Sequence, residues 1–115
     1  MEFCPALFIR KQIFKYNLIS LINIFKQNKI KVIFITVPIL GQWKEVDAIN
    51  ETIRNVCNRM NVNLVDIAKV FKEHESKDLY AEVDKVYKIY FHPSKKGNRI
   101  IVQQIIAEMK KMGIL

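Results

Sequence analysis

The feature that most constrains this chain is a dense run of apolar residues at positions 30–37. Its central part, Val32-Ile33-Phe34-Ile35-Thr36-Val37, is rich in β-branched side chains and does not alternate between apolar and polar positions. This pattern predicts a strand buried on both faces, as in a parallel sheet with helices on either side. Pro38 ends the run, and residues 39–43 then form a loop at the carboxyl end of the strand. In open α/β sheets, ligands bind at that end.

Segments with helical spacing lie on both sides of this strand. Apolar residues recur three or four positions apart over residues 11–28 and again over residues 46–60, which predicts two amphipathic helices. Asn61 is a suitable left-handed residue for the end of the second helix. A short buried strand at residues 62–65 and a short helix at residues 67–73 follow. Strands that alternate with helices predict right-handed crossovers and a parallel sheet.

The last third of the chain leads to a histidine at a helix start. Residues 74–84 are mixed and polar, residues 87–91 predict an extended segment, and residues 95–111 predict a helix that Gly113 ends. Pro93 keeps His92 out of helical geometry, and Ser94 is a good N-cap. His92 is therefore held on a stiff loop where its side chain can point into a cleft, although a surface histidine in an ordinary cap motif fits the local pattern too. The helix is expected to bury its apolar positions, which are Ile101, Val102, Ile105, Ile106 and Met109.

Composition limits the class of protein. A chain of 115 residues is one domain at most, and its 50% hydrophobic content predicts a packed core rather than disorder. The net charge of +8 permits an anionic partner, but basic residues are spread along the chain and never exceed two in a row. A nucleic-acid module concentrates them on one face. We therefore expect a solvated basic surface and no nucleic-acid partner.

Cysteine usage and hydropathy predict a cytoplasmic protein without cofactor or metal. Cys4 and Cys57 lie far apart, with no second cysteine or histidine at metal-ligand spacing. Cys57 falls on an apolar helical face, which predicts a buried free thiol in a reducing compartment. No signal peptide is recognisable, and the apolar stretch at residues 18–25 is too short to span a bilayer.

Four segments, in order and with matching spacers, resemble the C-terminal half of the SGNH (GDSL) hydrolase family. Residues 31–38 resemble its central strand, residues 50–54 open the next helix, and residues 63–67 resemble its strand that ends in Asp. His92-Pro93-Ser94 with Gly97-Asn98 resembles the family's last block. The resemblance covers residues 17–109 and implies a flavodoxin-like three-layer α/β/α fold with a parallel sheet. It makes residues 1–115 a single, partial SGNH-hydrolase-like domain.

The same resemblance implies ester hydrolysis, with His92 as the general base that serves a serine nucleophile. The family's substrates would be small-molecule or acylated-carbohydrate esters. Its Gly-Asp-Ser and Gly-x-Asn-Asp blocks are absent from this chain, and Ile89 stands where the family has the Asp that orients the histidine. Asp84 and Glu82 are the nearest acids upstream of His92. We therefore expect a family member without its first half, with Met1 as an internal or secondary start, inactive alone.

A domain that lacks its first half is expected to expose a sheet edge and apolar surface. Two strands make a thin sheet with an uncovered edge, and missing N-terminal strands would expose apolar surface. We expect self-association or a complementing chain. The alternative from another functional class is a non-catalytic basic interaction module that binds a protein or an anionic partner.

Five further side chains are weighed between a functional and a structural role. Asp66 could be catalytic, but N-capping of the following helix is favoured. Trp43 fits an acyl pocket and a cap over the exposed end of the sheet equally well. His74 and the pair Lys95-Lys96 are interpreted as solvated surface residues.

Overall fold

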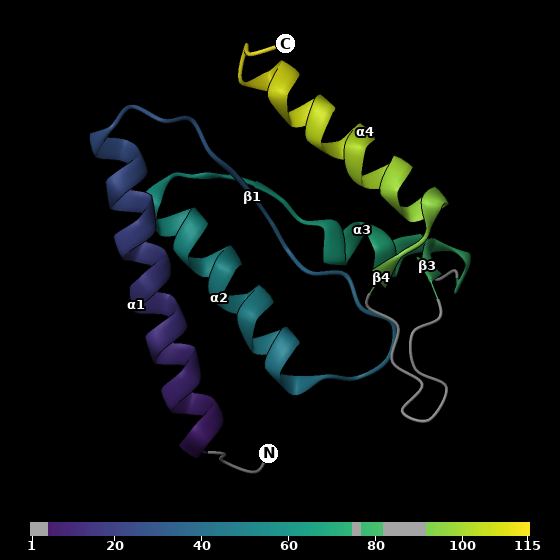
Figure 1. Cartoon of the computed structure of the whole chain (residues 1–115), viewed down its shortest axis with the longest axis horizontal. Helices are drawn as coiled ribbons and strands as arrows, with labels where there is room; N and C mark the ends of the chain where they lie inside the picture. The colour runs from purple at the N-terminus through teal and green to yellow at the C-terminus, as the bar shows by residue number, and fades with distance from the viewer. Residues whose placement is uncertain (1–4, 75–76, 82–91) are drawn as a thin grey trace.

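The computed structural model describes residues 5–74, 77–81 and 92–115 (Figure 1). These residues form four α-helices, one 3-10 helix and four short strands. In chain order the elements are α1 (Pro5–Gln27), β1 (Ile33–Ile35), α2 (Lys44–Met60), β2 (Asn63–Val65), α3 (Ile67–His74), the 3-10 helix η1 (Lys77–Leu79), β3 (Tyr80–Ala81), β4 (His92–Pro93) and α4 (Lys95–Lys111).

The strands pair in two small ribbons. β1 pairs with β2 in parallel, with Phe34 beside Leu64, and α2 is the crossover between them. The predicted parallel pairing of these two segments is therefore confirmed. β3 and β4 form a separate antiparallel ribbon in which Ala81 lies opposite His92.

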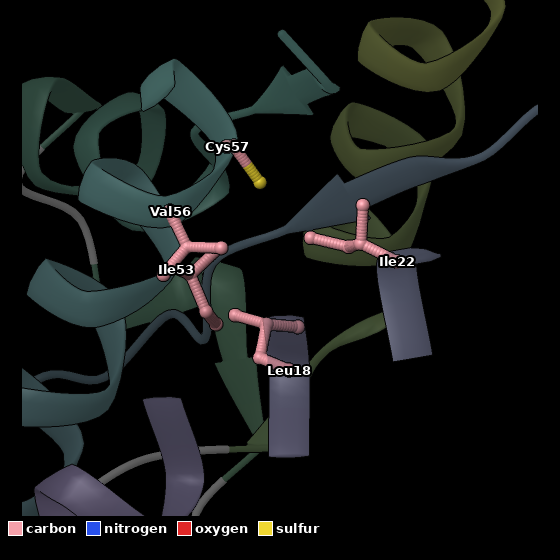
Figure 2. Close-up of a cluster of buried hydrophobic side chains, with 5 residues drawn as sticks. All are labelled: Leu18, Ile22, Ile53, Val56 and Cys57. Atoms are coloured by element: carbon pink, nitrogen blue, oxygen red, sulfur yellow. The ribbon is translucent and has the colours of Figure 1, made fainter. Parts of the chain in front are cut away.

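Two apolar clusters form the core, and the strands contribute to both. The first joins α1 to α2 through Leu18, Ile22, Ile53, Val56 and Cys57, whose side chains Figure 2 shows. Phe34 and Leu64 pack against this cluster. Because successive side chains of a strand point to opposite faces, Ile33 and Val65 instead join the second cluster, which contains Ile67, Phe71, Leu79 and Tyr80.

The predicted flavodoxin-like three-layer α/β/α fold is wrong. The described residues are mostly helical, and their strands of two or three residues make only two-stranded sheets. The interior strand expected at residues 30–37 is reduced to Ile33–Ile35, and Ile35 and Val37 are 38% and 39% exposed. The physical reason is that β2 is the only described strand that pairs with β1. Beyond Ile35, the backbone of Val37 bonds to the Asn50 side chain instead of to another strand.

The helices agree more closely with the predictions. α4 has the predicted bounds, and Asn61 is left-handed, with φ 56° and ψ 51°. α1 begins at Pro5, earlier than the predicted position 11, and proline suits a first helical turn because its missing N–H has no helical partner there. The expected burial along α4 is wrong, since Val102 and Ile106 are exposed and Ile101, Ile105 and Met109 are only partly buried. α4 packs with only one side against β2, η1 and α3, so its apolar residues cannot all be covered.

Candidate functional site

Four polar side chains meet at the carboxyl ends of β1 and β2, and we call Thr36, Asn50, Arg54 and Asp66 the Asp66 cluster. Thr36 is fully buried and lies one residue beyond β1. Its Oγ1 donates to Asp66 Oδ1 at 2.7 Å and accepts from the backbone N–H of Ala68 at 2.8 Å. Thr36 therefore ties the end of β1 to the first turn of α3.

Asp66 receives most of the hydrogen bonds in this cluster. Arg54 donates to both of its oxygens, from Nε at 2.8 Å and from Nη2 at 3.0 Å. The N–H of Lys69 donates to Oδ1 at 3.3 Å, so the predicted N-capping role of Asp66 is confirmed. Partial burial raises the pKa of Asp66, but hydrogen bonds from Arg54 and Thr36 and the guanidinium charge outweigh it, and the net pKa is lowered. The same hydrogen bond with Asp66 raises the pKa of Arg54.

Asn50 completes the cluster. Its side-chain amide bonds to the Val37 backbone, as the backbone of a neighbouring strand would. Its Oδ1 accepts from the N–H of Val37 at 2.7 Å, and its Nδ2 donates to the Val37 carbonyl at 2.8 Å. Among the described residues, no buried side-chain nitrogen or oxygen lacks a hydrogen-bond partner. The hydrogen bonds of the Asp66 cluster thus support the ends of β1 and β2, although the Arg54 side chain is 41% exposed.

His92 lies on a different element, the two-residue strand β4, and its side chain is exposed. Its backbone position is set by the pairing with Ala81, and Pro93 pairs with Tyr80. Tyr80 packs edge-on against Phe71, with ring centroids 5.4 Å apart, in the same cluster as Val65. Leu40, from the loop after β1, also packs there. The β3–β4 ribbon therefore lies near the ends to which β1 and β2 run (Figure 1).

The turn beyond His92 is fixed by contacts with η1, and we call Asp78, Leu79, Ser94, Lys96 and Gly97 the η1–α4 junction. The Ser94 N–H donates to the Leu79 carbonyl at 2.8 Å, and its hydroxyl donates to the Asp78 carbonyl at 2.5 Å. Lys96 Nζ forms a 2.7 Å ion pair with Asp78. The Ser94 hydroxyl also accepts from the Gly97 N–H at 3.1 Å, which confirms the predicted N-cap.

Gly97 brings the two parts of the junction into backbone contact. It is buried, and a Cβ at this position would overlap the Leu79 carbonyl and crowd the Phe71 ring. Only glycine lets α4 approach η1 this closely. The sequence placed Ser94 and Gly97 in a motif, but it gave no indication that Asp78 and Leu79 are their partners. The interpretation of Lys96 as a solvated residue is incomplete because it overlooked the ion pair.

The remaining described candidate side chains lie on other elements than His92. Ser20 lies on α1 and donates to the Tyr16 carbonyl at 3.0 Å. Ser76, Glu82, Asp84 and Ile89 lie outside the described residues. His74 is exposed on α3, with Nδ1 2.8 Å from the Val70 carbonyl. No group of three or more His, Cys, Asp or Glu side chains suited to a metal ion occurs in the described part of the chain.

Trp43 borders a hollow between α1 and α2 of about 440 Å³, whose lining includes none of the four residues of the Asp66 cluster. Apolar side chains of both helices line it, together with Arg10, Lys11 and Glu45.

Comparisons of the chain with protein-family models, curated proteins and solved structures found no match. Within the described ranges, no helix combines the length and the apolar character that crossing a membrane requires.

Proposed function

We propose that this chain supplies the general-base part of an SGNH-type ester hydrolase site, with His92 as the base, and that another polypeptide segment completes the site. One observation carries the proposal. His92 is an exposed histidine on a strand whose neighbours pack against the ends of the parallel pair β1–β2. Ligands of α/β sheets bind at those ends, so a histidine there can meet a substrate.

The chemistry assigned to His92 is proton transfer. Its ring nitrogen would accept the proton of a serine hydroxyl as that oxygen attacks the ester carbonyl, and would then return the proton to the leaving alkoxide. The η1–α4 junction fixes the backbone beside His92, which is what a positioned base needs. The substrate class in the completed site is a small-molecule or acylated-carbohydrate ester.

The isolated chain is expected to be inactive because it has no suitable nucleophile among its described serines. The Ser94 hydroxyl already donates to Asp78 and accepts from Gly97, and Ser20 is bonded within α1. Acyl transfer also needs oxyanion donors near the nucleophile, and the family's blocks that supply them are missing here.

The experiment is complementation in trans. The chain is co-refolded with the N-terminal half of an SGNH esterase that carries Gly-Asp-Ser and Gly-x-Asn-Asp blocks, and p-nitrophenyl acetate hydrolysis is measured. We expect the chain alone to match its His92→Ala variant and the mixture to be active. His92→Ala should abolish the activity of the mixture.

The second histidine is the matched control. The chain has two histidines, and His74 is also exposed but lies on α3. His74→Ala should leave the reconstituted activity unchanged. Equal activity of the His92→Ala and wild-type mixtures would refute the assignment of His92, and turnover by the isolated wild-type chain would refute the need for a partner.

We also propose that the protein is located in the cytoplasm. This location is supported by Cys57, which is a buried free thiol, as predicted. Burial raises the pKa of this thiol and so lowers its reactivity. Cell fractionation followed by immunodetection tests the setting, and a membrane or extracellular fraction would contradict it.

The alternative function, a non-catalytic interaction module, is favoured by a different observation. α1 exposes several large apolar side chains along its length, an arrangement that marks interaction surfaces.

A further inference from the structure

A small hollow between α1 and α2, which we call the cationic hollow, has three cations and no acid among its described lining residues. Its volume is about 170 Å³. Side chains at helical spacing line it from both helices, namely Lys11, Gln12 and Lys15 of α1 and Thr52, Asn55, Val56 and Arg59 of α2. Because α1 and α2 pack side by side (Figure 1), cations of both helices border the same space.

The charges around the cationic hollow are not balanced. α1 carries four cations and no acid over its 23 residues, so Lys15 has no partner on its own helix. Glu51 of α2 forms an ion pair of 3.4 Å with Lys11, which balances one of the three cations. In the described part of the chain, no salt bridge includes Lys15 or Arg59. Lys15 is partly buried, so its repulsion with the neighbouring cations is screened less than on an open surface.

The hollow also offers hydrogen-bond donors. Thr52 is the buried polar residue of the lining, at 2% exposed, and its hydroxyl already donates to the Ala48 carbonyl at 2.8 Å. Four other side-chain groups of the lining donate to no group that the structure describes, namely the ammonium of Lys15, the guanidinium of Arg59 and the amides of Gln12 and Asn55. An anion in the hollow can therefore be neutralised and hydrogen-bonded at once.

We propose that the cationic hollow binds a phosphate group, as inorganic phosphate or as the phosphate of a monoester. The charges match, because a phosphate carries a charge of about −2 at neutral pH and two cations lack an acid. A carboxylate would balance only one of them. A guanidinium pairs with phosphate through two parallel hydrogen bonds, and a lysine ammonium binds it as a point charge.

The size of the hollow limits what it encloses. Pockets that enclose a whole small molecule have volumes of roughly 300–1,000 Å³, and the cationic hollow has about 170 Å³. It therefore encloses the phosphate group and leaves the organic part of a monoester in solvent.

The proposal predicts opposite effects of one charge on the empty and on the occupied protein. In the empty hollow, Lys15 repels Lys11 and Arg59, so removal of its charge should leave the fold at least as stable. In the occupied hollow, the same charge holds the phosphate. The site consists of residues from two packed helices and forms only in the folded chain, so bound phosphate stabilises the fold.

Thermal unfolding of the full chain, followed by circular dichroism in sodium phosphate and in sodium chloride of equal ionic strength, tests the proposal. We expect phosphate to raise the unfolding temperature beyond the effect of chloride, by about 5 °C when it exceeds its dissociation constant about tenfold. Lys15→Gln and Arg59→Gln should each weaken phosphate binding by about tenfold or more in isothermal titration calorimetry. Without phosphate, Lys15→Gln should unfold at or above the wild-type temperature.

The matched control is Lys69→Gln, which removes one positive charge from an exposed side chain on α3. It should bind phosphate like wild type. Equal stabilisation by phosphate and chloride, or equal loss of binding in Lys69→Gln and Lys15→Gln, would show that phosphate acts through the net charge of +8 and would overturn the site. A Lys15→Gln protein that binds phosphate like wild type would overturn it as well.

Two further ligands identify the source of the phosphate group. Glycerol 3-phosphate represents a soluble monoester, and vesicles of phosphatidylcholine with phosphatidic acid represent a lipid headgroup. A thermal shift with the first, or pelleting with the second, supports the proposal when Lys15→Gln loses it and Lys69→Gln keeps it. A chain that binds none of the three phosphate forms would contradict the proposal. These outcomes are independent of the proposed hydrolase, because His92 lies on β4 and does not line the hollow.

Discussion

The Asp66 cluster and the η1–α4 junction show two ways in which this chain uses polar groups. In the Asp66 cluster, partly buried side chains bond to one another and to strand ends. In the junction, the side-chain bonds between α4 and η1 are exposed, and backbone atoms provide much of the contact. His92 lies beside the junction and stays exposed.

The two regions differ in how many parts of the fold their hydrogen bonds connect. The Asp66 cluster joins two strand ends and two helices through partly buried hydrogen bonds, so its loss should lower stability throughout the fold. The η1–α4 junction instead fixes a short backbone segment next to an exposed histidine. Substitutions in the two regions should therefore differ in how far their effects spread.

The largest expected effect comes from Gly97→Ala in the junction. Helix propensity alone would favour alanine by about 1 kcal/mol. The added Cβ overlaps the Leu79 carbonyl, a backbone atom that cannot rotate away. We expect a loss of about 3 kcal/mol in the free energy of unfolding, as for overpacked sites, measured by urea denaturation.

The control for Gly97→Ala is Asn98→Ala, which adds an alanine at the next, exposed position of α4. It should change stability by less than about 0.7 kcal/mol. A Gly97→Ala protein as stable as the control would show that η1 and α4 are not held in contact.

A smaller effect is expected from Asp66→Asn in the cluster. The variant loses the charge of the pair with Arg54, whose side chain is 41% exposed and can return to water, so we expect about 2 kcal/mol. The pKa of Asp66 is lowered in the folded protein. Its contribution is therefore complete above the unfolded pKa, about 4, and is lost as the pH falls through the folded value.

The pH dependence distinguishes this pair from a packing effect. The stability difference between wild type and Asp66→Asn should be constant from pH 5 to about pH 8 and should shrink below about pH 4. Urea denaturation at several pH values measures it. A difference that stays the same down to acid pH would contradict an electrostatic role for Asp66.

Local structure was largely predictable from the sequence. The bounds of α4, the left-handed Asn61 and the Ser94 cap depend on residues within one or two turns of each other, so their pattern is sufficient. The parallel pairing of β1 with β2 was also predictable, because α2 between them leaves few other connections.

The errors concern contacts between distant residues. An apolar run shows that a strand prefers burial, but it does not show whether the chain has strands enough to cover it, and β1 has one described partner. Asp78 and Ser94 lie 16 positions apart with no shared pattern. One signal was missed: Asn50 and Arg54 are four apart on one helix face, directed at the strand ends where Asp66 lies.

The smallest and most local effect is expected from Ser94→Ala. This change removes the hydroxyl that accepts from the Gly97 N–H and donates to the Asp78 carbonyl, but it keeps the backbone bond to Leu79. Loss of an N-cap of this type costs about 1 kcal/mol. Ser94→Thr keeps the hydroxyl and should lose less than about 0.5 kcal/mol. Hydrogen exchange at the Gly97 amide should accelerate in Ser94→Ala while the amides of α2 stay protected, because the Asp66 cluster is untouched. Equal acceleration in α2 would show that the junction and the cluster unfold as one unit, and the distinction between them would fail.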